Sequence, residues 1–132
     1  MSTIVIACIA VMGALVFGLG ANVTRHRANR GAHGGPQMPT DPADRLLIAQ
    51  RAHGNAAEYV PTLIGLLIVC STLTGGWWLD VLAIAATTAR VVHAYGMLSA
   101  RTLAEHGPVR DSGAAFTYLA GLALGITAVV AM

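Results

Sequence analysis

The sequence predicts an all-α membrane protein, a bundle of four transmembrane helices with both termini on the non-cytoplasmic side. Three observations carry this prediction. The chain has 132 residues, of which 55% are hydrophobic and only 11% charged, whereas soluble domains carry about a quarter charged residues. The apolar residues gather in four long runs, separated by stretches rich in Gly, Pro or charged residues. Most of the basic residues, all of them Arg, fall beside two of the three connections.

The first apolar run, residues 4–23, is long enough to cross a hydrocarbon core of about 30 Å. No basic residue precedes it, and it is longer than the apolar region of a secretory signal. We therefore expect a retained transmembrane helix. The polar stretch that follows, residues 24–43, is rich in Gly, Pro and Arg and predicts a loop.

The second helix is predicted over residues 43–73, with Asp41 or Asp44 as its N-cap and Pro42 in its first turn. It is too long for the membrane alone, so its first turns should stand in or beyond the headgroup layer. Pro61 lies within it and should loosen the preceding turn.

Gly75 and Gly76 predict a tight turn, after which Trp77 and Trp78 mark a membrane interface. The third helix is predicted over residues 78–100. The segment RTLAEHGPVRDS is expected to form the next loop, and the fourth helix should run over residues 113–131.

The fourth helix carries small residues at four-residue spacing, namely Thr117, Gly121 and Gly125. Such a face suits close packing of membrane helices. We predict that all 132 residues form one four-helix domain.

The arginines predict the orientation. Arg25, Arg27 and Arg30 follow the first helix, Arg101 and Arg110 follow the third, and the other end of the predicted bundle has none. The positive-inside rule places these Arg-bearing loops in the cytoplasm and both termini outside, in a bacterial inner membrane or its equivalent.

We expect no nucleic-acid partner, no disulfide and no metal site. The net charge of +2 comes without a long basic block, which argues against nucleic acid. Cys8 and Cys70 each lie inside an apolar run, so we interpret them as buried apolar residues and predict neither a disulfide nor a metal site.

Polar residues gather in the segment QRAHGNAAEYVP, at the start of the second apolar run. Arg51, Asn55 and Glu58 are spaced four and three residues apart and therefore share one helix face. Tyr59 flanks this face and His53 lies to its side. Charged groups inside a membrane are costly unless they are paired or face a wet cavity.

Glu58 has a natural partner in Arg90, near the middle of the third helix, where no acidic residue is close in sequence. Arg51 then remains free to bind a ligand carboxylate. A structural interpretation stays open beside this one. Arg51 could extend to the lipid headgroups, Glu58 and Arg90 could only hold the helices in register, and the histidines could be hydrogen-bonded interior residues.

The string R-A-H-x-N-x-x-E-Y-x-P, from Arg51 to Pro61, resembles the second-helix signature of the MAPEG family. That family includes microsomal glutathione transferases and the glutathione-dependent leukotriene and prostaglandin synthases. The resemblance covers the whole chain, with four helices, a polar first loop and the segment RVVHAYG in the third helix. It implies a homotrimer that binds glutathione, as a co-substrate, between neighbouring subunits.

The resemblance also implies which residues contact glutathione. Two anionic carboxylates of this tripeptide suit Arg, its amine suits Glu58 and its amides suit Asn55. His93 and Met97 stand where several members of the family carry Tyr, and Tyr95 is a possible substitute. The glutathione-binding residues expected on this basis are Arg51, His53, Asn55, Glu58, Tyr59, Arg90, His93 and Tyr95.

The chemistry that the resemblance implies is thiolate formation. A thiol with a pKa of about 8.5 is little ionised at neutral pH, and a nearby guanidinium stabilises its anion. Members of the family use an Arg near the cytoplasmic end of the third helix, and Arg101 is the nearest residue of this kind, with Arg110 farther away. The function expected is a glutathione-dependent transferase or peroxidase that acts on lipophilic electrophiles in the bilayer.

Three alternatives remain at this stage. A non-catalytic relative would bind glutathione or a lipid without activating a thiol. A small proton-coupled exporter would use Glu58 as its titrating residue. A haem-binding electron carrier would use His53 and His93 as axial ligands.

Overall fold

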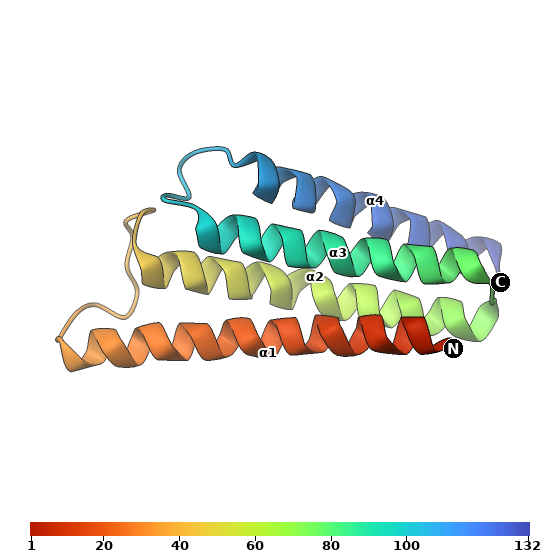
Figure 1. Ribbon diagram of the computed structural model, residues 1–132, viewed down its shortest axis with the longest axis horizontal. Helices are drawn as coiled ribbons and strands as arrows, with labels where there is room; N and C mark the ends of the chain where they lie inside the picture. Colours follow the sequence, from red (N-terminus) through yellow and green to blue (C-terminus); the bar gives the residue numbers. More distant parts are fainter.

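The computed structural model describes all 132 residues and contains four helices and no strands. They are α1 (Thr3–Ala32), α2 (Arg45–Leu73), α3 (Trp77–Ser99) and α4 (Pro108–Val130). Figure 1 shows the four helices side by side, with both termini at one end and the two longer connections at the other. Each helix is long and apolar enough to cross a membrane. The predicted fold class is thus confirmed, while the side on which the termini lie stays a prediction.

The first helix is longer than the sequence predicted. It continues to Ala32, and its 30 residues span about 45 Å. The prediction of a loop from residue 24 was wrong because RHRANRGA contains mainly good helix formers. Arg25 also donates a hydrogen bond to the Asn22 side chain one turn earlier, at 3.2 Å. The helix ends before Gly34, whose positive φ of 68° suits glycine.

The second helix begins with a side-chain cap. One carboxylate oxygen of Asp44 accepts the backbone N–H groups of Leu46 and Leu47, at 2.8 and 3.4 Å, which confirms one of the two predicted N-caps. Arg30 near the end of α1 donates to both carboxylate oxygens at 2.7 and 2.6 Å. These hydrogen bonds from Arg30 hold the pKa of Asp44 below its usual value of 3.8. The contact fastens the first connection to both helices that it joins.

The last helix starts five residues earlier than predicted. It begins at Pro108, a position that suits proline because the first N–H groups of a helix have no intrahelical partner. Consequently Arg110 lies in the first turn of α4, where the sequence reading expected a loop. This change decides which arginine reaches the candidate site.

Helices α3 and α4 approach each other most closely at two glycines. A Cβ atom built on Gly113 would lie 2.5 Å from the backbone nitrogen of His93, and one built on Gly96 would lie 2.5 Å from that of Arg110. Either distance is far below ordinary van der Waals contact. Only a residue without a Cβ therefore permits this approach.

The small residues highlighted by sequence behave differently from one another. Thr117 is buried and donates a hydrogen bond to the Gly113 carbonyl at 2.7 Å. A Cβ on Gly121 would meet only Leu63, at an ordinary 3.7 Å, and one on Gly125 would meet nothing within 4 Å. Within the chain, α4 thus approaches α3 most closely at Gly113, one to three helical turns before the predicted positions Thr117, Gly121 and Gly125.

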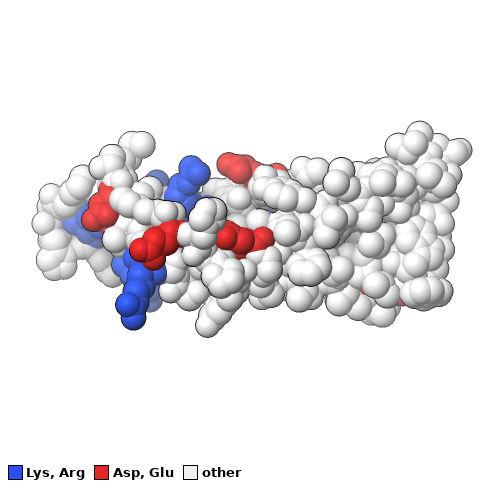
Figure 2. Space-filling model, turned by 90° about the horizontal axis from the view of Figure 1, so that it is seen from above, with Lys and Arg blue, Asp and Glu red and all other residues white.

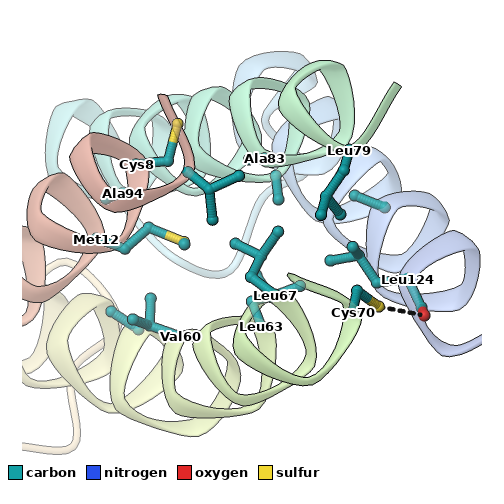
Figure 3. Close-up of a cluster of buried hydrophobic side chains, with 14 of the residues drawn as sticks. Cys8, Met12, Val60, Leu63, Leu67, Cys70, Leu79, Ala83, Ala94 and Leu124 are labelled. Atoms are coloured by element: carbon teal, nitrogen blue, oxygen red, sulfur yellow. Dashed lines mark hydrogen bonds between the residues drawn. The ribbon is translucent and has the colours of Figure 1, made fainter. Parts of the chain in front are cut away.

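The two middle helices form the centre of the bundle. α2 contacts each of the other three helices, and so does α3, whereas α1 and α4 do not touch. The apolar core contains side chains from all four helices, and Cys70 donates a weak hydrogen bond to the Leu124 carbonyl at 3.4 Å (Figure 3). Cys8 and Cys70 are both buried and unpaired, as predicted. The space-filling view shows that charged side chains gather toward the end that carries the long connections (Figure 2).

Candidate functional site

A polar cavity of about 300 Å³ lies between α2, α3 and the start of α4, at the charged end of the bundle. Arg51, Asn55 and Glu58 all line it, as their shared helix face predicted. The remaining lining residues are Gln50 and Gly54 from α2, His93 and Met97 from α3, Leu103 from the last connection and Arg110 from α4.

The predicted pair between Glu58 and Arg90 is wrong. Arg90 instead donates from Nη2 to Oδ1 of Asn55 at 2.7 Å and from Nη1 to Thr117 at 3.5 Å. Helical spacing placed Asn55 and Glu58 on one face but could not show which of the two a side chain from α3 would reach. Glu58 is exposed and takes part in none of the ion pairs of the chain.

Arg90 is a buried cation behind the cavity wall, with only 1% of its surface exposed. Its guanidinium lies 5.4 Å from the centre of the Tyr59 ring, within the range of a cation–π contact. The Tyr59 hydroxyl lies 3.3 Å from that of Tyr118, and the two rings meet edge to face. The Nε atom of Arg90 is buried without a hydrogen-bond partner. The charge is thus held by an amide, a hydroxyl and a ring, with no carboxylate.

His93 lies at the close crossing of α3 and α4. Its Nδ1 atom is 2.8 Å from the backbone carbonyl oxygen of Arg110. The residue is only 6% exposed, and its Nε2 atom is buried without any hydrogen-bond partner. An unpartnered polar atom in a cavity wall is a rare feature, and it marks a place for a ligand or a water molecule.

Arg110 is the cavity residue to which the sequence pattern gave too little weight. Its Nη2 group donates to the Glu105 carbonyl at 2.8 Å, and its Nε group lies 3.5 Å from the Asp111 carboxylate. These contacts hold the guanidinium beside the last connection, and the residue lines the cavity. The signal that could have found it was Pro108, since a proline at the first helical position would place Arg110 in the first turn of α4.

Five of the residues expected at the site do not line the cavity. Arg90 and Tyr59 contact each other outside its lining, and the other three lie elsewhere in the chain. Arg101 and Tyr95 are exposed and do not line the cavity. His53 lines a different cavity, of about 680 Å³, between α1, α2 and the first connection. Because His53 and His93 line different cavities, the structure does not bring together the two ligands that the haem alternative requires.

An apolar groove of about 380 Å³ lies deeper in the bundle, between α2 and α4. Tyr59 and Thr117, which hold Arg90, also line this groove. Three leucines, Leu63, Leu66 and Leu122, make up half of its other lining residues. The buried Arg90 thus contacts lining residues of both the polar cavity and the apolar groove.

The cavity combines charges of both signs with neutral polar groups. Arg51 and Arg110 can bind carboxylates, Glu58 can bind an amine, and Gln50 can bind amides. This set of groups suits a small zwitterionic peptide with more than one carboxylate.

The model of the MAPEG family matches residues 5–130, nearly the whole chain. No curated protein matches the sequence.

Proposed function

The chain belongs to the MAPEG family and is an integral multi-pass membrane protein; from this premise we propose that it is a glutathione-dependent transferase or peroxidase. In this proposal glutathione binds in the polar cavity, and its thiol is activated toward lipophilic electrophiles dissolved in the bilayer.

The observation that carries the proposal is the charge arrangement of the polar cavity. Arg51 and Glu58 both line it and neither takes part in an ion pair of the chain. Charged groups at a membrane surface that lack internal partners are available to a ligand. A volume of about 300 Å³ lies at the lower end of the range for small-molecule sites, about 300–1,000 Å³.

We propose that a neighbouring subunit completes this site in a homotrimer. The cavity is bordered by exposed side chains of α2, including Arg51 and Glu58. His53 and Arg27 line the separate cavity beside α1. In a trimer, this second surface would face the glutathione site of the next subunit.

The apolar groove supports a lipophilic second substrate. Its surface is largely apolar, and its lining includes Tyr59 and Tyr118, whose hydroxyls meet. An electrophile that enters from the bilayer through this groove would approach the polar cavity from its membrane side.

Arg110 is the arginine that we propose to stabilise the thiolate. It lines the cavity and is held there by the Glu105 carbonyl. Arg101, the residue expected from the sequence, is exposed and outside this cavity. A guanidinium must lie near the sulfur to stabilise its anion, and this requirement favours Arg110.

Titration calorimetry of glutathione into the detergent-purified protein tests binding, and difference absorbance at the thiolate band tests activation. Arg51→Gln should weaken binding, and Arg110→Gln should abolish the thiolate signal. Arg25→Gln is the matched control, because Arg25 lies on α1 away from the cavity. Arg101→Gln is the competing variant.

Each outcome has a distinct meaning. Loss of the thiolate signal in Arg101→Gln but not in Arg110→Gln would return the activating role to Arg101. Saturable binding without any thiolate signal would indicate a binding relative without chemistry. No binding would refute the proposal, and proton movement dependent on Glu58 would then favour the exporter.

A further inference from the structure

We propose that His93 is a catalytic residue of this site, the base that accepts the thiol proton of glutathione at its Nε2 atom. The inference rests on the proposed function, and it assigns to this chain a proton acceptor in addition to the arginine that stabilises the thiolate.

The tautomer of His93 follows from its backbone contact. Nδ1 lies 2.8 Å from the carbonyl oxygen of Arg110. A carbonyl oxygen can only accept, so Nδ1 must carry the hydrogen. In the neutral ring the lone pair is therefore on Nε2, which makes this atom an acceptor.

The Nε2 atom belongs to a residue of the cavity wall, and it is buried without a partner. His93 lines the polar cavity, is more than nine-tenths buried, and has no hydrogen bond at Nε2. Leaving a buried acceptor unpaired is costly. A ligand that brings a hydrogen-bond donor to this atom removes that cost, and the thiol is such a donor.

The thiol is the group of glutathione that fits this position. Glu58 is the only carboxylate that lines the cavity, and it suits the ligand's ammonium group. The amide groups of the ligand do not release protons near neutral pH. A thiolate ordinarily binds a proton more tightly than an imidazole does. A favourable charge near the sulfur lowers the proton affinity of the thiolate and so favours the transfer.

The charged surroundings favour proton transfer only when the thiol is present. The charged groups around the ring are Arg90 on α3 and Arg110 and Asp111 on α4, while Arg51 and Glu58 on α2 line the same cavity. The guanidinium groups oppose an isolated imidazolium. They stabilise a thiolate, so an imidazolium that forms together with a thiolate is much less disfavoured.

The geometry resembles that of other activated nucleophiles, in which a base next to the nucleophile is oriented by a third group. Here the orienting group is the Arg110 carbonyl, which keeps Nδ1–H bonded in both protonation states of the ring. Gly113 permits this contact, because a Cβ there would lie 2.5 Å from the His93 nitrogen.

The step is balanced without an external reagent. The S–H bond breaks, a new N–H bond forms at Nε2, and the products are a thiolate and an imidazolium. When the thiolate adds to an activated double bond, the Nε2 proton passes to the carbon that receives the electron pair. When it displaces a leaving group, that group departs with the electron pair and the proton is released with it.

A proton inventory in the wild-type protein tests the inference directly. Calorimetry of glutathione binding at pH 7, in buffers of different ionisation enthalpy, counts the protons released. Difference absorbance in the same samples counts the thiolate formed. If His93 keeps the proton, the wild type releases close to zero protons per thiolate. If a guanidinium acts alone, it releases close to one.

The His93→Gln variant and S-methylglutathione complete the experiment. Glutamine cannot take the proton, so thiolate in this variant should fall at least tenfold, or appear with one proton released per thiolate. S-methylglutathione has no thiol proton and should bind both proteins without a change in proton count.

The outcomes separate this inference from the proposed function. Release of one proton per thiolate in the wild type would overturn the role of His93 and leave the proposed function intact. Binding without thiolate would overturn both the base and the catalytic proposal while retaining the site. No binding of glutathione would overturn the proposed function and this inference together. If His93→Gln does not fold, the wild-type proton count still decides.

Discussion

Replacing Gly113 by alanine tests the contact on which the candidate site depends. The new Cβ atom would lie 2.5, 2.7 and 2.8 Å from the nitrogen, Cα and Cβ of His93. Ordinary contact begins at 3.4 Å, so α4 must move away from α3 by about 0.9 Å at this crossing. Neither helix backbone can yield locally, since both are hydrogen-bonded along their length.

Two effects should follow from this displacement. Overpacking of a tight contact costs about 1–3 kcal/mol of unfolding free energy. The same movement stretches the 2.8 Å contact between His93 and the Arg110 carbonyl beyond hydrogen-bond range. We therefore expect Gly113→Ala to lower stability and to reduce the thiolate signal with bound glutathione.

Unfolding in mixed detergent micelles, followed by circular dichroism, measures the first effect, and difference absorbance measures the second. Gly125→Ala is the matched control on the same helix, because its Cβ would meet nothing within 4 Å. It should be neutral or more stable by up to about 1 kcal/mol. Equal stability of the two variants would refute the packing argument, and an unchanged thiolate signal in Gly113→Ala would refute the link to His93.

Three further predictions concern groups around the site. Because the pKa of Asp44 is lowered in the fold, its carboxylate stabilises the protein fully above pH 3.8 and loses this contribution as the pH falls through the lowered value. Asp44→Asn should thus cost about 1 kcal/mol at pH 7 by detergent unfolding, and the difference from wild type should shrink in acid. Asn55→Leu removes the acceptor that lies 2.7 Å from buried Arg90, and it should lower the free energy of unfolding by about 1–3 kcal/mol. Adding Arg90→Met should recover part of this loss. If the effects of the two substitutions on the free energy of unfolding were strictly additive, the pairing would be contradicted. Arg51→Gln should weaken glutathione binding, measured by calorimetry, about tenfold to a hundredfold. It should leave the free energy of unfolding unchanged. A lower free energy of unfolding with unchanged binding would favour a structural role for Arg51.

The buried Arg90 illustrates how a membrane bundle can hold a charge. Its partners are neutral. They are the Asn55 amide and the Tyr59 ring from α2 and the Thr117 hydroxyl from α4. A carboxylate partner would cancel the charge, whereas these partners leave its positive field behind the cavity wall. That field favours an anionic ligand and disfavours a lone imidazolium.

Local patterns in the amino-acid sequence were sufficient to predict the class and the outline of this protein. Long apolar runs can satisfy their backbone groups in lipid only as helices, so composition and run length were sufficient for four transmembrane helices. The spacing of Arg51, Asn55 and Glu58 was sufficient to predict that they line one cavity, because the face on which a helical residue lies depends only on its place along that helix. The end of α1 and the start of α4 were misplaced, because helix formers near glycine and proline allow more than one boundary.

Which side chains meet across helices depends on how the helices pack in three dimensions. Glu58 and Asn55 are equally available to α3 by spacing, yet Arg90 reaches Asn55. Arg110 reaches the cavity and Arg101 does not, because α4 begins at Pro108. The crossing at Gly96 and Gly113 sets the distance between α3 and α4. Such contacts depend on how close two helices come and how each is rotated about its axis, and packing decides both.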